Sequence, residues 1–210
     1  MDSRSQSQSD LNEALLEAAE HGSITEIQSL LDRHADIHAL SDNEGATALH
    51  YASSEGHHQC VELLLDRHAD IHARSELFED TPLHFASSSG RYQCVELLLD
   101  RHADIHARSD DDSATPLHYA STNGHHQCVE LLLDRHADVN ALDLCNDTPL
   151  HHASREGHHQ CIELLIDHFA NKYLTDVRHC VPLSPSLARS CNLNILPASH
   201  PQMSLTLSSC

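Results

Sequence analysis

Histidine and cysteine are the side chains of this sequence with the richest chemistry, and both are abundant. The 210 residues include 22 histidines and eight cysteines, and both side chains bind zinc. Four histidine pairs are adjacent in the sequence: His57-His58, His125-His126, His151-His152 and His158-His159. Zinc is held at about 2.0–2.1 Å by convergent groups, whereas adjacent side chains on a helix point about 100° apart. No Cys-x-x-Cys or His-Glu-x-x-His motif occurs, so we expect no metal site and no cofactor.

Catalysis and proton sensing are the other common uses of histidine. The sequence has no Gly-x-Ser-x-Gly motif, phosphate-binding loop or kinase signature, so we expect no enzymatic activity. Proton sensing stays open, because the reference pKa of histidine lies near 6.5. Protonation of 22 imidazoles would offset most of the formal net charge of −20.

Four cysteines occupy equivalent positions, each just before a Val/Ile-Glu-Leu-Leu run: Cys60, Cys94, Cys128 and Cys161. If those runs are stacked helices, they lie about 8–10 Å apart, whereas a disulfide needs Cα atoms within about 7 Å. We therefore expect unpaired cysteines packed in the core. Free thiols indicate a reducing compartment, and we expect the cytoplasm, with the nucleus as the alternative.

The spacing of these cysteines belongs to an internal repeat. The segment Gln59–Ser75 returns unchanged as Gln93–Ser109 and with small changes from Gln127 to Ala141. Each copy is preceded by Thr-x-Leu-His, and the threonines of this motif are 34, 34 and 33 residues apart. A fixed period of this length is typical of a solenoid, in which each unit buries its apolar face against its neighbours.

One unit can be read in detail between Asp42 and Ser75. Residues 42–46 are rich in turn formers, and Thr47 is a helix N-cap candidate. A short helix is predicted from Ala48 to Glu55, and Gly56 is expected to end it in the left-handed conformation. A second helix is predicted from His58 to Arg67, with apolar residues at helical spacing. Each unit is therefore a turn followed by two helices.

These residues resemble the ankyrin repeat. The stretch Asp42-Asn43-Glu44-Gly45-Ala46-Thr47-Ala48-Leu49-His50-Tyr51-Ala52 is similar to the opening of the family pattern, with Ala48 in place of proline, and Ala137-Asp138-Val139-Asn140-Ala141 is similar to its ending. The resemblance covers about Leu11 to Asp176. It implies an all-α ankyrin-repeat solenoid of stacked helix-turn-helix units with β-turn fingers, a concave binding face and no catalysis.

The resemblance also assigns roles to several histidines. It implies that the signature histidines hydrogen-bond near the helix start and tie adjacent turns: His50, His84, His118 and His151. It gives His72 and His106 the hydrogen-bonding role of an asparagine, and the remaining histidines are expected to be solvated. A family glycine that needs a positive φ is replaced by His34, His68, His102 and His136, which predicts a modest loss of stability.

The register divides the chain into units. Residues 1–10 are expected to be a disordered N-terminus and residues 11–41 an N-terminal capping repeat. Full repeats are expected at residues 42–75, 76–109, 110–142 and 143–176. Residues 177–210 are expected to be a degraded half repeat and a disordered tail, because Pro197 and Pro201 interrupt any second helix. This ragged end leaves open that the chain is a truncated version of a longer one.

The acidic composition restricts the partners. Aspartate and glutamate outnumber lysine and arginine by 32 to 12, and such a surface repels the phosphates of nucleic acid and anionic membranes. No run approaches the 18 or more apolar residues of a membrane-spanning helix. We expect a monomer that binds a basic or neutral protein partner, without nucleic acid or membrane.

In this architecture the fingertips and the inner face of the first helices contact a partner, and these positions vary between repeats that are otherwise nearly identical. They are Asn43, Glu44, Ala46, Ser54 and Glu55; Leu77, Phe78, Asp80, Ser88 and Ser89; Asp111, Asp112, Ala114, Thr122 and Asn123; and Leu144, Cys145, Asp147, Arg155 and Glu156. Neutral drift in solvated loops would also produce such variation. Leu77 and Phe78 are the sharpest candidates, as an apolar anchor, unless Phe78 folds back onto its own repeat.

The sequence thus predicts a non-catalytic protein–protein interaction scaffold that binds through its concave face. Two alternatives remain at this point. The chain could be an adaptor that recruits substrates to a larger complex such as a ubiquitin ligase, or a truncated structural fragment without a specific partner.

Overall fold

The computed structural model describes residues 3–110 and 112–168, which form ten helices and no strand. The helices are α1 (Ser3–Glu20), α2 (Ile24–Asp32), α3 (Ala48–Glu55), α4 (His58–Asp66), α5 (Pro82–Ser88), α6 (Tyr92–Asp100), α7 (Pro116–Thr122), α8 (His126–Asp134), α9 (Pro149–Glu156) and α10 (His159–Asp167). The all-α solenoid is confirmed, and the predicted helix bounds of the repeat at residues 42–75 agree to within one residue.

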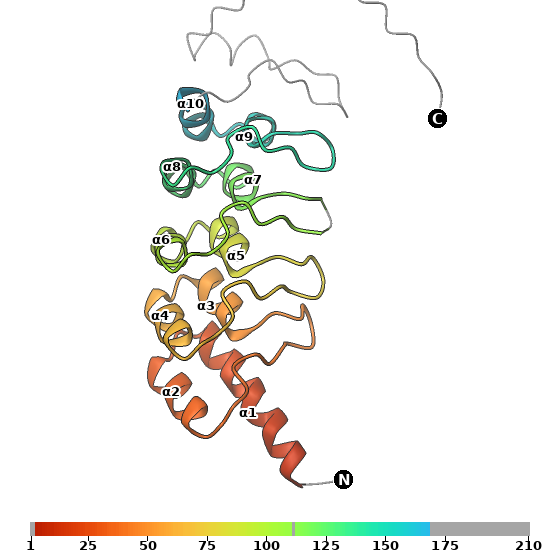
Figure 1. Cartoon of the computed structure of the whole chain (residues 1–210), viewed down its shortest axis with the longest axis vertical. Coiled ribbons are helices and arrows are strands. Elements are labelled where there is room, and N and C mark those ends of the chain that lie inside the picture. Colours follow the sequence, from red (N-terminus) through yellow and green to blue (C-terminus); the bar gives the residue numbers. More distant parts are fainter. Residues whose placement is uncertain (1–2, 111, 169–210) are drawn as a thin grey trace, which may run out of the picture.

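The helices pack in pairs that stack along one axis (Figure 1). The odd-numbered helices form one column and the even-numbered helices form a second, and each helix contacts the equivalent helices above and below it. The loops between successive pairs project from the same side of the stack as a row of fingers (Figure 1). The odd-numbered column therefore lies between the fingers and the even-numbered helices.

The first helix of each full repeat begins at a threonine that caps it. Thr47, Thr81, Thr115 and Thr148 have extended backbone conformations and form capping boxes with the histidine three residues later. In α5, α7 and α9 a proline follows, at a position where its missing N–H has no helical partner. The Thr-Pro-Leu-His motif thus acts as a helix start signal.

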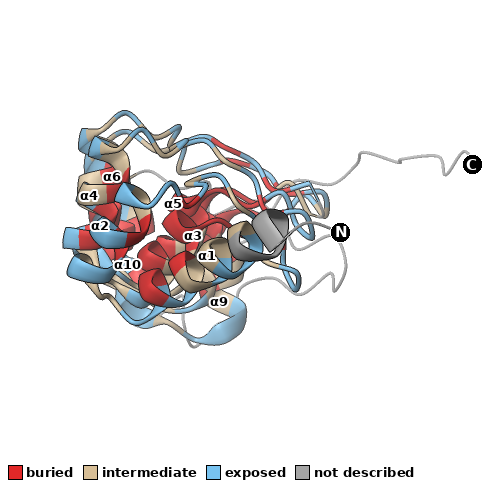
Figure 2. Cartoon of the chain, turned by 90° about the horizontal axis from the view of Figure 1, so that it is seen from below, coloured by how far each residue is buried: buried red, intermediate tan, exposed pale blue. Residues whose placement is uncertain are grey.

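Each layer of the core consists of leucine, alanine, valine and cysteine. Leu49, Leu83 and Leu117 lie at the centre of the odd column, each at most 1% exposed, and Leu64 and Leu98 lie opposite them in the even column. Figure 2 shows this buried interior between the two columns. Burying each leucine stabilises the fold by about 1.5–3 kcal/mol, so the small aromatic content does not prevent a continuous core.

The N-terminus differs from the prediction. Residues 1–10 were predicted to be disordered, but α1 begins at Ser3. The side-chain amide of Gln8 donates hydrogen bonds to the carbonyl oxygen of His34, at 2.9 Å, and to the side chain of Asn12, at 3.0 Å. These contacts extend the helix of the capping repeat beyond its apolar part. The predicted half repeat and tail at residues 177–210 lie outside the described residues.

The four histidines that replace glycine have the positive φ expected of that position, and the predicted loss of stability remains a prediction. His34, His68, His102 and His136 have φ values of 67°, 68°, 68° and 69°. In the fingers, Gly45 and its equivalents Glu79, Ser113 and Asn146 also have positive φ. The backbone therefore keeps the conformations that glycine favours although other residues occupy seven of these eight positions.

Candidate functional site

The fingers form one continuous wall, because each is hydrogen-bonded to the one before it. The N–H of Glu76 donates to the carbonyl oxygen of Glu44 at 3.0 Å, and that of Asp110 donates to the carbonyl oxygen of Phe78 at 3.0 Å. The N–H of Leu144 donates to the carbonyl oxygen of Asp112 at 2.7 Å. The fingertips therefore occupy fixed positions relative to one another.

Two arginines reinforce this wall. The guanidinium of Arg74 donates to the carbonyl oxygens of Glu79 in its own finger, at 3.0 Å, and of Arg108 in the next repeat, at 2.9 Å. Arg108 repeats the arrangement with Ser113, at 3.2 Å, and Leu142, at 2.8 Å. A single side chain thus closes one finger and joins it to its neighbour.

The signature histidines join each helix start to the next finger, as predicted. The N–H of Thr47 donates to Nδ1 of His50 at 3.1 Å, and Nε2 of His50 donates to the carbonyl oxygen of Asp80 at 3.0 Å. His84 and His118 do the same in their repeats. Burial lowers the pKa of each of these three imidazoles to about 4, so they are neutral at pH 7.

A second set of histidines also joins the repeats, and here the prediction of solvated side chains was wrong. Nε2 of His57, His125 and His158 donates to the carbonyl oxygens of Glu20, Ser88 and Thr122 respectively, at 2.9–3.0 Å. Glycine makes room for these rings. A Cβ atom on Gly90, which has φ +68°, would lie 2.5 Å from Nδ1 of His125.

The two histidines that replace an asparagine of the family pattern are His72 and His106. Both are exposed, and their backbone N–H groups donate to the carboxylates of Asp70 and Asp104.

The odd-numbered helices carry a column of rings at the position after the signature histidine. Phe85 packs edge-on against His50 with ring centroids 4.9 Å apart, and Tyr119 packs in the same way against His84 at 5.4 Å. His152 does so against His118 at 5.4 Å. These half-buried rings form part of the surface between the fingers and the odd helices.

The predicted recognition residues fall into three groups. Exposed residues are Asn43, Glu44, Glu55, Leu77, Phe78, Asn123, Leu144, Arg155 and Glu156, and half-buried residues are Ser54, Ser88, Ser89, Asp112, Thr122 and Cys145. Buried residues are Ala46, Asp80, Ala114 and Asp147. Asp111 lies outside the described residues.

The four buried residues are corrections to the prediction. They share one position, directly before the N-cap threonine, where the chain runs from the finger into the helix. The carbonyl oxygens of Asp80, Ala114 and Asp147 accept the histidine bond from the preceding repeat. The Asp80 carboxylate accepts from the hydroxyl of Tyr119 at 3.1 Å, and the Asp147 carboxylate lies 2.6 Å from Arg155. Both carboxylates are therefore engaged inside the protein and do not face a partner.

Several of the half-buried residues also serve internal contacts. The hydroxyl groups of Ser54 and Ser89 lie 3.1 Å apart, and the side-chain amide of Asn123 donates to Ser88. The hydroxyl of Thr122 donates to the carbonyl oxygen of His118 and lies 3.0 Å from Nδ1 of His152. These positions of the inner helices connect successive repeats.

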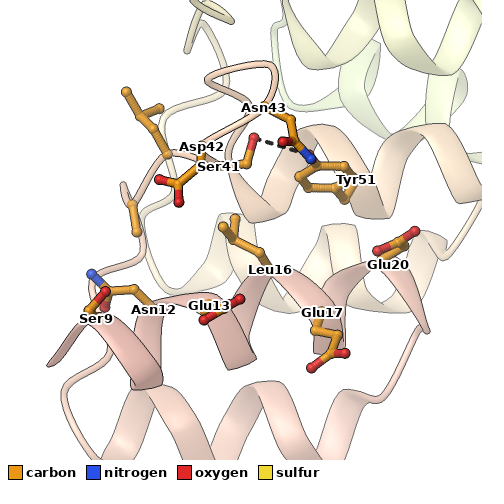
Figure 3. A pocket seen from close by; sticks show the side chains of 12 residues that line it. Ser9, Asn12, Glu13, Leu16, Glu17, Glu20, Ser41, Asp42, Asn43 and Tyr51 are labelled. Atoms are coloured by element: carbon orange, nitrogen blue, oxygen red, sulfur yellow. Dashed lines mark hydrogen bonds between the residues drawn. The ribbon is translucent and has the colours of Figure 1, made fainter. Parts of the chain in front are cut away.

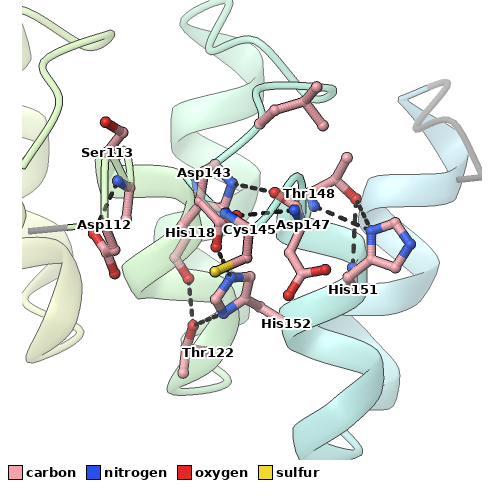
Figure 4. Close-up of polar contacts among 12 residues, drawn as sticks. Asp112, Ser113, His118, Thr122, Asp143, Cys145, Asp147, Thr148, His151 and His152 are labelled. Carbon is pink, nitrogen blue, oxygen red and sulfur yellow. Dashed lines mark hydrogen bonds and ion pairs between the residues drawn. The ribbon is translucent and has the colours of Figure 1, made fainter. Parts of the chain in front are cut away.

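Asp143, Asp147 and His152 bring three potential metal ligands within 4.8 Å of one another. Asp143 accepts from the N–H groups of Cys145 and Asp147, and its second oxygen lies 3.0 Å from Nε2 of His152 (Figure 4). Although burial acts to raise the pKa of Asp143, these hydrogen bonds lower it. A metal ion would have to compete with these contacts and with Arg155. The hydrogen bonds and ion pairs of the cluster stabilise the start of α9, which explains why these residues lie together.

A groove near the N-terminus was not found from the sequence. It has a volume of about 470 Å³ and lies between α1 and the first finger (Figure 3). Its lining includes acidic side chains, with Leu16, Leu40 and Tyr51 from both walls. The sequence hints at this groove only through the absence of a motif, because α1 lacks the Thr-x-Leu-His that begins the first helix of the other repeats.

The repeated cysteines are unpaired and buried, as predicted. Burial raises the pKa of Cys60, Cys94, Cys128 and Cys161, to about 12 for Cys94. They are therefore protonated at neutral pH and act as small apolar side chains.

None of the helices within residues 3–110 and 112–168 has the length and apolar character needed to cross a membrane.

Comparisons with known proteins agree with this architecture. A comparison with curated proteins finds no match. Models of ankyrin repeats match residues 15–65, 49–99 and 83–176. The chain therefore belongs to the ankyrin repeat family, whose repeats form protein–protein interaction modules.

Proposed function

We propose that this chain binds a protein partner through its fingers and concave face, without catalysing a reaction. The observation that carries the proposal is the exposure of three large apolar side chains on a braced wall. Leu77, Phe78 and Leu144 are 57%, 46% and 63% exposed at the tips of two fingers. Because the backbone of these fingers is already hydrogen-bonded in place, less conformational entropy is lost when their apolar side chains bind a partner.

The charge of the wall suggests the kind of partner. Acidic residues surround the apolar tips, including Glu44, Glu76 and Glu79, while Arg74 and Arg108 are occupied by carbonyl oxygens of the fingers. A partner with an apolar patch in a basic or neutral surface complements this face, and the charges accelerate its association. The protonated core cysteines agree with a reducing compartment, and we propose that the chain acts as a monomer in the cytoplasm.

The experiment compares capture of proteins from a cell lysate by the wild-type chain and by a variant with Leu77, Phe78 and Leu144 changed to serine. The control is Tyr92→Ser, which removes an exposed aromatic ring from α6, in the other helix column. A partner that is retained by the wild type and by the control, but lost by the triple variant, supports the proposal. A partner retained equally by all three would show that the fingertips are not the binding site.

A further inference from the structure

A groove lies between α1 and the first finger, and the internal contacts of the stack leave it open. Its lining residues are Ser9, Asn12, Glu13, Leu16, Glu17, Glu20, Ala39, Leu40, Ser41, Asp42, Asn43 and Tyr51. Figure 3 shows the side chains of α1 on one side of this space, with the finger residues and Tyr51 on the other. A volume of about 470 Å³ is large enough for one long side chain and its neighbours in a peptide.

The apolar part of the groove is in place before anything binds. The hydroxyl of Tyr51 donates to Oγ of Ser41 at 3.0 Å, which fixes its ring beside the finger. Leu16 lies on the opposite wall, and Leu40 is 43% exposed at the finger base. An aliphatic stem could pack between these side chains, and a planar cation could stack on the tyrosine ring.

All the charged residues that line the groove are acidic. Four lining residues are acidic, Glu13, Glu17, Glu20 and Asp42, and none is basic. Within the described part of the chain, no arginine, lysine or histidine forms an ion pair with these four carboxylates. The pKa of His21, nearby, is raised first by its hydrogen bond with the Glu17 carbonyl and further by the charges of Glu20 and Glu17. The groove therefore has a negative field, and its carboxylates form no ion pair among the residues that the structure describes.

The repeat itself shows that this charge is confined to the first unit. Tyr51, Phe85 and Tyr119 follow Glu17 in the 34-residue register, and Ser54, Ser88 and Thr122 follow Glu20 in the same way. These six residues are neutral and take part in ring contacts and hydrogen bonds within the stack. The fifth unit has His152 and Arg155 at these positions, and neither is acidic. At these two register positions, carboxylates therefore occur only in the first unit.

We propose that this groove binds an arginine side chain of the protein partner. The guanidinium would pair with Glu17 and Glu20, and its aliphatic stem would pack on Leu16 and Tyr51. Arginine is favoured over lysine because its planar fork pairs with carboxylates in two places and stacks on an aromatic face. The inference rests on the proposed function, since the arginine belongs to the bound partner, and it adds a second contact point formed by residues other than Leu77, Phe78 and Leu144.

The test uses the full chain and the blocked tripeptide acetyl-Leu-Arg-Leu-amide, followed by two-dimensional ¹H–¹⁵N NMR. Saturable shift changes are expected in α1 and residues 39–51, with the glutamine version of the peptide binding at least five-fold more weakly. The double change Glu17→Gln with Glu20→Gln is expected to weaken the arginine peptide at least five-fold. The matched control is Glu130→Gln with Glu163→Gln, two exposed carboxylates on α8 and α10, which removes the same charge and is expected to alter affinity less than two-fold.

Three results would overturn the inference. Shift changes away from the groove would place the peptide site elsewhere. Equal weakening of peptide binding by both double variants would show that the net charge of the chain, and not Glu17 and Glu20, attracts the peptide. Equal affinity for acetyl-Leu-Lys-Leu-amide, the same peptide with lysine in place of arginine, would overturn the choice of arginine. The Leu77, Phe78 and Leu144 variant is expected to bind the arginine peptide normally. Failure of the groove is therefore distinguishable from failure of the fingertip proposal, which is tested by capture of the partner.

Discussion

The Nε2 atom of His50 lies 3.0 Å from the carbonyl oxygen of Asp80, 30 residues further along the chain. The same ring accepts from the N–H of Thr47 through Nδ1. One imidazole therefore completes the start of its own helix and holds the finger of the next repeat. Every full repeat within residues 42–147 uses this arrangement, so the histidine is as much a part of the interface between layers as the leucines are.

Removal of one such ring should destabilise the stack. His84→Ala leaves the N–H of Thr81 and the carbonyl oxygen of Ala114 without this partner, and it opens a cavity, which together cost roughly 2–4 kcal/mol of unfolding free energy. Urea unfolding followed by circular dichroism measures the loss. The control is His106→Ala, an exposed histidine, which should change stability by less than about 0.5 kcal/mol. Equal effects of the two changes would remove the structural role of His84.

Acidification should weaken the fold through the same histidines. His50, His84 and His118 have folded pKa values of about 4, below the unfolded value of 6.5. The unfolded chain therefore binds more protons between these values, and stability is lost as the pH falls from 6.5 to 4. The loss is on the order of 1–3 kcal/mol for each histidine. Urea midpoints measured from pH 7.5 to 4.5 should fall, and a flat profile would contradict the low pKa values.

Asp80 has the opposite effect on the pH dependence of stability, because the charged form that burial disfavours is the one present at high pH. Burial raises its pKa to about 6, above its ordinary value of 3.8, so ionisation of Asp80 destabilises the folded chain, and this cost grows as the pH rises from 3.8 through 6. Asp80→Asn should stabilise the chain at pH 7.5 by about 1–2 kcal/mol, because the amide oxygen can still accept from Tyr119. The gain should shrink below pH 6. Asp110→Asn, at an exposed finger position, is the control, and a loss of stability in Asp80→Asn would show that the buried charge is itself stabilising.

The histidines with positive φ offer a direct route to higher stability. His68 is exposed and has φ 68°, a conformation that costs most residues about 1–2 kcal/mol and glycine little. After the greater entropy of glycine in the unfolded chain is subtracted, His68→Gly should raise the unfolding free energy by about 0.5–1 kcal/mol. His102→Gly should add a similar amount, and thermal unfolding of the single and double variants measures both. Destabilisation by either change would indicate a contact of the ring that outweighs the backbone strain.

Exposed and buried apolar residues should respond in contrasting ways. Leu98 is 0% exposed, and Leu98→Ala should cost roughly 2–5 kcal/mol of unfolding free energy. Phe78 is 46% exposed, and Phe78→Ala should cost less than about 1 kcal/mol while weakening partner binding by about 2 kcal/mol or more. Urea unfolding and binding measurements separate the two effects. If Phe78→Ala unfolds the stack, Phe78 is part of the core and the fingertip proposal fails.

The repeat pattern made the helices predictable, because start and stop signals such as Thr47 and Gly56 act within a few residues. The roles of Asp80 and His57 depend on atoms 30 to 39 residues away, and their position in one repeat says little about what the next repeat places against them. Asp80 shares its register position with Ala46 and Ala114, and the variation at this position suggested a contact with a partner although the backbone buries it. The N-terminal groove was missed because it depends on how α1 faces the first finger.

The identical segments Gln59–Ser75 and Gln93–Ser109 place Val61 and Val95, and Leu64 and Leu98, in equivalent surroundings, each 0% exposed. The cores of α4 and α6 therefore carry no information about which of these two layers comes first. Their order is specified by chain connectivity and by the residues that differ between the two repeats, in the fingers and in the first helices.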